Sequence, residues 1–140
     1  MVKKEPKVII TTGKRKSSIA RARISPGSGR VLINSRPLDM WSSELARMRV
    51  KGPLILSGDL AKKVNIDVTA ESGGVAGQAD AIRTSIARSL VEFFKSEELR
   101  KRFIEYDRSL LTFDPRRNEP HHGHGASKRG SRRHKQRSKR

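Results

Sequence analysis

The chain has 140 residues, enough for one modest hydrophobic core, and its 32 lysine and arginine residues against 14 acidic ones give a formal net charge of +18. A surplus of this size requires a polyanionic partner, either nucleic acid or an anionic membrane surface. Cysteine is absent, which excludes disulfides and thiolate metal sites, and the chain shows neither an apolar run of about 18 residues nor an export signal, so we expect a soluble protein inside the cell.

The distribution of hydrophobic residues predicts where the folded part ends. The Ile, Val, Leu and Phe residues number 32, and all lie between Val2 and Phe113. Residues 114–140 contain none of these types but hold ten basic residues and two acidic ones. Such a segment is typical of disorder until a partner neutralises it. The sequence therefore predicts a globular body over residues 1–113 and an extended basic tail over residues 114–140 that is disordered when free.

The first third of the body has the pattern of strands. Residues 7–12 are rich in β-branched types and predict a strand that breaks at Gly13. From Ser18 to Ile24, small or apolar residues alternate with Ile19, Arg21 and Arg23, so a second strand would point its arginines away from the packing face. The turn signal at residues 26–29 and the apolar run at residues 31–33 predict a hairpin between the second and third strands.

The rest of the body has mainly helical patterns. Residues 39–51 predict a helix, which Gly52-Pro53 is expected to break before a second short one. Residues 64–70 alternate as in a half-buried antiparallel strand, and from Gln78 the apolar residues step along one helical face with Arg83 and Arg88 away from it. Ser96 can cap a last helix. The predicted fold class is α+β, a mostly antiparallel four-stranded sheet with helices on one face.

Motifs for catalysis fail on spacing. Gly13-Lys14-Arg15 lacks the earlier glycine and the following hydroxyl of a nucleotide phosphate loop. Gly27-Ser28-Gly29 lacks the third glycine of a dinucleotide fingerprint and is interpreted as a turn. The aspartates are scattered without a nearby histidine or nucleophile. We therefore expect no enzyme activity, no cofactor and no small-molecule substrate.

Two further clusters have competing interpretations. The block Gly73-Gly74-Val75-Ala76-Gly77 precedes a predicted helix, so its amides could hold a phosphate oxygen, although tight connection geometry alone is the favoured reading. The cluster of His121, His122 and His124 is interpreted as solvated or RNA-facing rather than as a metal site, because the tail offers no fixed structure to hold ligands.

The basic residues give the strongest functional signal. Five of them, Lys14, Arg15, Lys16, Arg21 and Arg23, fall on or next to the first two predicted strands. A charge run is often a solvated face, but a solvated face needs roughly balanced signs, and this chain has a large surplus of one sign. The aromatic residues do not interleave with the basic segments, so a stacking platform for single strands is not predicted. We expect contacts with the phosphates of folded RNA.

Three segments carry a family resemblance: residues 12–23 (Thr-Gly-Lys-Arg-Lys-Ser-Ser-Ile-Ala-Arg-Ala-Arg), the block 73–83 that continues into Gln-Ala-Asp-Ala-Ile-Arg, and the ending 136–140. Their order and spacing resemble the universal small-subunit ribosomal protein nine family. The segment Asp114-Pro115-Arg116-Arg117 resembles its archaeal and eukaryotic branch, and the Ser-Lys-Arg ending together with the size favours archaeal. The resemblance implies a fold like the second domain of ribosomal protein five. It also implies a cytoplasmic location, in the head of the small ribosomal subunit.

The resemblance also implies partners and contact residues. The tail would run through ribosomal RNA to the peptidyl site, where Arg137, Ser138, Lys139 and Arg140 would contact the bound transfer RNA. Neighbouring proteins of the head would be further partners. The expected ribosomal RNA contacts are Lys14, Arg15, Lys16, Arg21, Arg23, Gly73, Gly74, Gly77, Arg83, Arg116, Arg117, Lys128, Arg129, Arg132, Arg133 and Lys135.

Two alternatives belong to other classes. A free-standing nonspecific nucleic-acid-binding protein or RNA chaperone would use the same charge, and copurification with small subunits separates it from a ribosomal protein. An enzyme of the small-molecule kinase superfamily, which shares this general fold, would need a complete glycine-rich phosphate loop and acidic metal ligands, and the sequence has neither.

Overall fold

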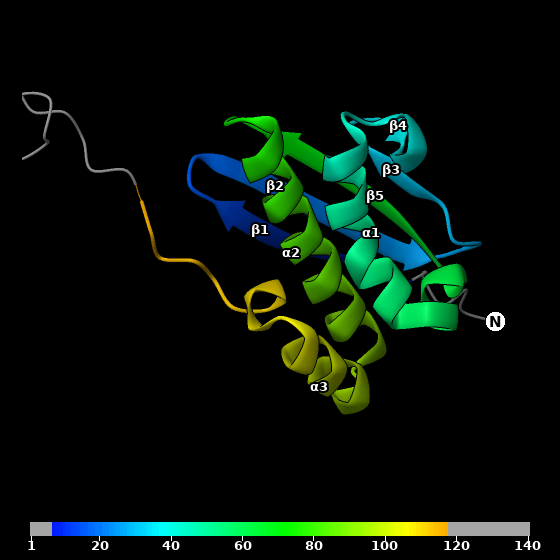
Figure 1. Ribbon diagram of the computed structural model, residues 1–140. Coiled ribbons are helices and arrows are strands. Elements are labelled where there is room, and N and C mark those ends of the chain that lie inside the picture. The colour runs from blue at the N-terminus through cyan, green and yellow to red at the C-terminus, as the bar shows by residue number, and fades with distance from the viewer. Residues whose placement is uncertain (1–6, 118–140) are drawn as a thin grey trace, which may run out of the picture.

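Five strands and three α-helices are found in residues 7–117, the part of the chain that the computed structural model describes (Figure 1). The strands are β1 (Ile9–Arg15), β2 (Ser18–Pro26), β3 (Val31–Ile33), β4 (Arg36–Pro37) and β5 (Val64–Glu71). The helices are α1 (Glu44–Ser57), α2 (Val75–Phe94) and α3 (Glu97–Tyr106), with 3-10 turns η1 (Leu38–Met40), η2 (Gly58–Lys63) and η3 (Arg108–Leu110).

The strands form one sheet in the order β1-β2-β5-β3-β4. The pairs β1–β2, β2–β5 and β3–β4 are antiparallel, and β3–β5 is parallel. Helices α1 and α2 cover one face of this sheet (Figure 1). The α+β class and the mostly antiparallel sheet are confirmed. The predicted strand count of four is one too low, because Asn34 and Ser35, both at positive φ, turn the chain into the two-residue strand β4.

The predicted hairpin between the second and third strands is wrong. Strand β5 lies between β2 and β3 and pairs with both. The side-chain Oδ1 of Asn65 accepts hydrogen bonds from the backbone N–H groups of Ser28 and Arg30, at 3.0 and 3.2 Å, so the loop crosses the start of β5. The hairpins of this sheet join β3 to β4 and β1 to β2, the latter through Lys16 at φ 53° and Ser17. Strand β1 continues to Arg15 and does not break at Gly13 as predicted.

Helix α1 begins later than the predicted start at residue 39 and continues through the predicted break at Gly52-Pro53. It runs unbroken from Glu44 to Ser57 with Pro53 inside it, where the proline ring is buried. Gly52 stands before the proline and has no Cβ, which relieves the clash that normally keeps a pre-proline residue out of the helical conformation. The hydroxyl of Ser57 donates a hydrogen bond to the carbonyl of Pro53. The Gly52-Pro53 pair is thus compatible with a continuous helix.

The predicted core faces are confirmed. On β2, Ala20, Ala22 and Ile24 are fully buried, whereas Arg21 and Arg23 are exposed. On α2, Ile82, Ile86 and Leu90 are fully buried against the sheet. The predicted cap of the last helix is present, because the hydroxyl of Ser96 accepts the N–H of Leu99 at 3.3 Å.

No helix within residues 7–117 combines the length and the apolar composition that crossing a lipid bilayer requires.

The likeness of the body to the second domain of ribosomal protein five stays a prediction.

Gly13 brings β1 directly against α2. A Cβ at this position would lie 2.1 Å from the carbonyl oxygen of Ala81 and 2.7 Å from the amide nitrogen of Ser85. Next to it, the buried hydroxyl of Thr11 donates a hydrogen bond to the carbonyl of Ser85 at 2.8 Å. Only a residue without a side chain fits between this strand and this helix.

The variant Gly13→Ala should therefore lose about 3 kcal/mol of unfolding free energy, because the added methyl group forces the backbones of β1 and α2 apart. The matched control is Gly74→Ala, where a Cβ meets nothing within 4 Å. As a change at a helix N-cap, it should cost less than about 1 kcal/mol. Urea unfolding followed by circular dichroism measures both. Equal losses would contradict the close packing of β1 on α2.

Candidate nucleic-acid interface

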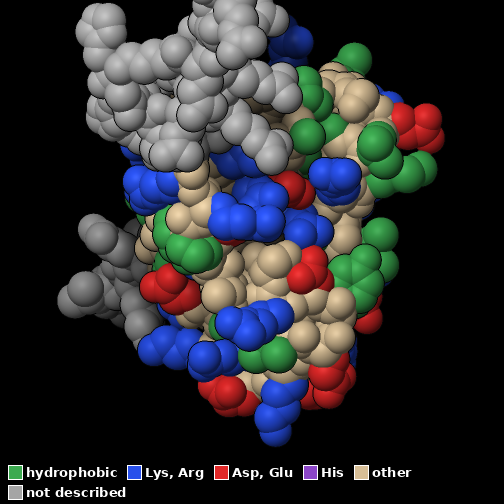
Figure 2. Space-filling model, turned by 60° about the vertical axis from the view of Figure 1, so that its left-hand side comes forward, with side chains coloured by type: hydrophobic (Ala, Val, Ile, Leu, Met, Phe, Trp, Pro, Cys, Tyr) green, Lys and Arg blue, Asp and Glu red, His purple; other side chains and the backbone are tan. Residues whose placement is uncertain are grey.

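The turn between β1 and β2 and the segment that follows α3 meet on one side of the molecule (Figure 1). They enclose a crevice of about 210 Å³. Four cations line it, together with residues of other types; its lining is Lys14, Lys16, Ser17, Ile19, Phe113, Asp114, Arg116 and Arg117. Lys and Arg side chains gather on the side of the body that contains this turn, with Asp and Glu side chains among them (Figure 2).

Arg88 of α2 holds the segment after α3 against the sheet. Its guanidinium donates two hydrogen bonds to the carbonyl of Leu111, at 3.2 and 3.1 Å. A third N–H group donates to the carbonyl of Thr12 in β1, at 2.9 Å. One planar, multi-donor side chain thus joins three segments of the chain.

Arg83, one turn and a half earlier on α2, holds the same segment nearer to α3. Its Nη2 donates to Oδ2 of Asp107 at 2.9 Å and to the hydroxyl of Ser109 at 2.8 Å. Burial alone would raise the pKa of Asp107, but hydrogen bonds from the Ser109 hydroxyl and amide, and then the charge of Arg83, outweigh it. The net effect is a pKa below the ordinary aspartate value, so this carboxylate is charged at neutral pH.

Asp80 at the start of α2 lies among three arginines. Its carboxylate oxygens are 3.8 Å from Nε of Arg15, 3.6 Å from Nη1 of Arg49 and 3.7 Å from Nε of Arg83. Arg15 also pairs with Asp114, at the beginning of the segment Asp114-Pro115-Arg116-Arg117. This charge cluster connects the end of β1 to the root of the predicted tail.

The arginines of β2 lie on the face of the sheet opposite the helices. Arg21 is 3.8 Å from Glu71 of β5, with both side chains more than half exposed, so the pair adds little stability. Arg23 stands opposite Asp67 in the β2–β5 register. The Oδ1 atom of Asp67 is buried and accepts no hydrogen bond from residues 7–117.

The glycine block is shaped mainly by packing. A Cβ at Gly73 would lie 2.0 Å from the hydroxyl oxygen of Ser18, and one at Gly77 would lie 2.8 Å from the same atom. Gly73 also has φ +72°. Gly74, by contrast, has open space around it and is the N-cap of α2. Tight geometry therefore accounts for Gly73 and Gly77, while phosphate contact by this block stays a prediction.

The predicted RNA-binding residues fall into separate groups. Lys14, Lys16, Arg116 and Arg117 come together in the crevice, where the guanidinium of Arg116 pairs with Asp114 at 3.1 Å. Arg15 and Arg83 are also held in ion pairs, and Arg21 and Arg23 lie on the sheet face. The following predicted residues lie outside the described part of the chain: His121, His122, His124, Lys128, Arg129, Arg132, Arg133, Lys135, Arg137, Ser138, Lys139 and Arg140. Residues 7–117 contain no cluster of side chains able to hold a metal ion.

Sequence reasoning missed three residues of this region. Arg88 gave only the signal that it lies off the apolar face of α2, and no periodicity indicates that it binds carbonyls of two other segments. Asp114 and Phe113 stand at the boundary where the hydrophobic residues end. That boundary was the available signal, because a chain that leaves a folded body needs residues to fix its exit.

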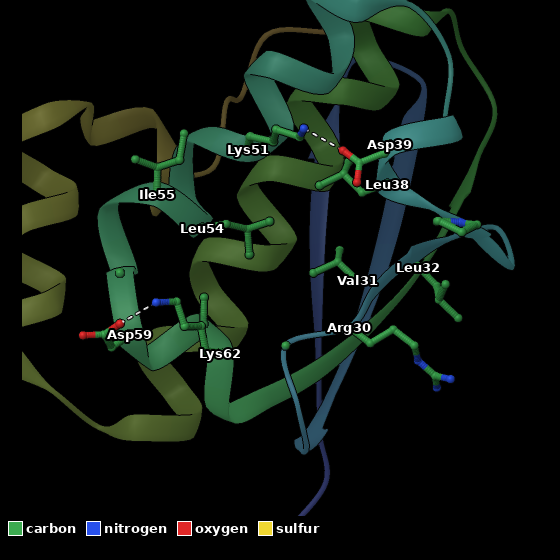
Figure 3. Close-up of a pocket in the computed structure, with 14 residues that line it drawn as sticks. Arg30, Val31, Leu32, Leu38, Asp39, Lys51, Leu54, Ile55, Asp59 and Lys62 are labelled. Atoms are coloured by element: carbon green, nitrogen blue, oxygen red, sulfur yellow. Dashed lines mark hydrogen bonds and ion pairs between the residues drawn. The ribbon is translucent and has the colours of Figure 1, made fainter.

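A separate depression of about 710 Å³ lies between α1, η2 and the start of β3 (Figure 3). Its walls include Val31, Leu38 and Leu54. Two ion pairs lie on its rim, Lys51 with Asp39 at 2.6 Å and Lys62 with Asp59 at 2.8 Å. The hydrogen bonds from these lysines lower the pKa of each aspartate. With its charges largely paired, this depression lacks the positive surplus that a phosphate site requires.

Comparison with known proteins gives consistent matches. A family model described as ribosomal protein S9/S16 matches residues 13–140. A small ribosomal subunit protein uS9 from Pyrobaculum aerophilum is 49% identical over 132 residues, which cover 92% of this chain and 93% of the relative. Proteins of the same description from Desulfurococcus amylolyticus and Aeropyrum pernix are 54% identical over 114 residues and 48% identical over 130 residues. These matches cover 81% of this chain, with 81% and 86% of the respective relatives.

The tie between Arg83 and Asp107 predicts a pH-dependent contribution to stability. Asp107→Asn should lower the unfolding free energy at pH 7 by about 1 kcal/mol, a value discounted for the partial exposure of the pair. Because the folded-state pKa of Asp107 lies below its ordinary value, the contribution is present above pH 4 and is lost as the pH falls through the folded-state pKa. Urea unfolding of both proteins between pH 7 and 2.5 measures this. A difference that grows on acidification would contradict the assignment.

Proposed function

The chain belongs to the ribosomal protein S9/S16 family, and on that premise we propose that it is a structural constituent of the small ribosomal subunit that binds ribosomal RNA through phosphate contacts. The observation that carries the proposal is the crevice in which the β1–β2 turn and the root of the tail bring together four cations with one carboxylate. The family match supplies the ribosome as the setting, and the crevice supplies a surface suited to RNA.

The chemistry of the crevice suits a phosphodiester backbone. Lys14 and Lys16 are compact point charges without an ion pair in residues 7–117. Arg117 offers a planar fork of N–H donors, and Arg116 offers the N–H groups that do not bind Asp114. The hydroxyl of Ser17 can donate a further hydrogen bond. Contacts of this kind fix the position of a protein on RNA without reading the base sequence, so recognition would rest on the shape of the folded RNA.

A second basic surface supports the same proposal. Arg21 and Arg23 project from the helix-free face of the sheet, next to the turn that carries Lys14 and Lys16. Arg15 and Arg83 are assigned a different part in this proposal. Their ion pairs with Asp114 and Asp107 make them positioning residues for the crevice, with phosphate contact as a secondary property.

The tail completes the proposal. The family match extends to Arg140, and the basic residues from Lys128 onward lie within it. We propose that residues 114–140 extend from a body of residues 1–113 in the subunit head towards the peptidyl site, where Arg137, Ser138, Lys139 and Arg140 contact the backbone of the bound transfer RNA. The body would share its fold with the second domain of ribosomal protein five.

Stoichiometric copurification with small subunits at high salt tests the ribosomal assignment, and recovery only as free protein would favour a free-standing RNA chaperone.

Neutralising Lys14, Lys16 and Arg23 together with glutamine should flatten the dependence of ribosomal RNA affinity on log salt concentration by about two to three units, because each lost phosphate contact removes about 0.7 to 0.9 units. Filter binding at several salt concentrations measures the slope. The matched control replaces Lys62, Lys63 and Lys101, three charges on η2 and α3, and should leave the slope nearly unchanged. Equal effects of the two triple variants would assign binding to overall charge rather than to this surface.

Deleting Ser138 to Arg140 should leave subunit incorporation intact and weaken peptidyl-site transfer RNA binding by about 1 to 3 kcal/mol, the range for one or two charge-assisted hydrogen bonds. Since phosphate contacts do not read sequence, transfer RNAs with different anticodons should lose similar affinity. Filter binding to small subunits that carry the truncated protein measures the effect. Unchanged affinity, or a loss for one anticodon only, would exclude a backbone clamp.

A further inference from the structure

Phe113 is an exposed aromatic residue that lines the cationic crevice. It is the last of the Ile, Val, Leu and Phe residues in the sequence. It is 41% exposed, although burial of its ring would be favourable. It lines the crevice together with Lys14, Lys16, Ser17 and other residues. The Cζ carbon of Arg117 lies 5.9 Å from the centroid of the Phe113 ring, within the range of a cation–π contact.

The segment around the ring is fixed from both sides. Before it, the carbonyl of Leu111 accepts two hydrogen bonds from Arg88. After it, Asp114 pairs with Arg15 and accepts the backbone N–H of Arg116 at 2.9 Å. Contacts made by its neighbours in the chain therefore fix the position of Phe113, while part of the residue stays exposed. A ring that is positioned but left partly uncovered is preorganised to receive a flat apolar surface.

The groups beside the ring indicate which flat surface fits. Apart from Phe113, the only apolar residue in the lining is Ile19, and the remaining residues are charged or hydroxylated. An apolar peptide would leave these charges desolvated and unpaired. A nucleotide presents a π-face for the ring and a phosphate for the two lysines at the same time, and unpaired bases stack on both aromatic rings and arginine planes.

We propose that Phe113 stacks on one unpaired base of the bound RNA, while Lys14 and Lys16 hold the phosphates beside that base. This inference rests on the proposed function and names the structure that the crevice takes, an RNA with a bulged or looped-out nucleotide rather than a continuous duplex. Because every base has a π-face, the site selects an unpaired position with little preference for base identity.

The experiment compares two RNA hairpins of equal length and charge in fluorescence anisotropy titrations, one fully paired and one with a single bulged nucleotide. The tail and the basic surface contribute equally to both, so the ratio of the two affinities isolates the unpaired base. The full-length wild-type protein should favour the bulged hairpin by about tenfold. Phe113→Leu should reduce this ratio to near one, and Phe113→Trp should retain it because an aromatic ring is restored.

Tyr106→Leu is the matched control, since Tyr106 is another aromatic residue, 65% exposed, at the end of α3 and not part of the crevice lining. It should leave the ratio unchanged. In the Phe113→Trp variant, the bulged hairpin should also quench tryptophan fluorescence more strongly than the paired hairpin does. The native Trp41 is buried and supplies a constant background.

The outcomes separate this inference from the proposed function. A wild-type ratio near one, or an equal loss of the ratio in Phe113→Leu and Tyr106→Leu, with both hairpins still bound, overturns the stacking site and leaves phosphate binding standing. If the wild type binds neither these hairpins nor ribosomal RNA, the proposed function fails and this inference fails with it. A ratio that Phe113→Leu abolishes and Phe113→Trp restores establishes the site.

Discussion

The close approach of the β1–β2 hairpin to helix α2 determines where the charged groups of this protein lie. Gly13 lets the backbone of β1 lie against Ala81 and Ser85, and Gly73 and Gly77 leave room for Ser18 at the turn of the hairpin. At this separation, Arg88 spans from α2 to the carbonyls of Thr12 and Leu111. A wider gap would put those carbonyls beyond its reach. The crevice, the charge cluster and the position of residues 111–117 all depend on this packing of three glycines.

The arginine and lysine side chains of this region have different roles. The arginines at positions 15, 83 and 88 bind carboxylates or carbonyls of other segments, which suits a planar fork with several donors that keeps its geometry when partly buried. The lysines at the β1–β2 turn, Lys14 and Lys16, are exposed. An ammonium on a flexible stem can follow a phosphate without a fixed approach direction. A count of cations along the sequence therefore exceeds the number available to RNA.

Periodicity in the sequence predicts most of the elements, because the alternation in β2 and the helical step in α2 each reflect one buried face. It does not predict strand order. The turn at residues 26–29 indicates where the chain bends, but the insertion of β5 beside β2 depends on Asn65 and on long-range pairing. Likewise, Pro53 predicts the end of a helix, unless one considers that Gly52 before it has no Cβ to clash with the proline ring. For the site, the charge pattern and the family resemblance predict Lys14, Lys16, Arg116 and Arg117. The hydrogen bonds of Arg88 and the position of Phe113 depend on the three-dimensional packing and cannot be predicted from a pattern in the sequence.

Asp114 is the residue least suited by charge to the proposed phosphate-binding crevice, because a carboxylate repels a phosphate. Its contacts explain its presence. It pairs with Arg15 and with the guanidinium of Arg116, which cancel its charge locally. It also accepts the backbone N–H of Arg116, which sets the backbone direction immediately after Pro115. At physiological ionic strength, charges separated by more than about 8 Å are largely screened, so the position of each cation matters more than the total. The neutralised Asp114 thus fixes Arg116 and Phe113 beside Lys14 before RNA binds. In the proposed function this would favour RNA binding more than an additional mobile cation, because ordering these residues costs no further entropy in the complex.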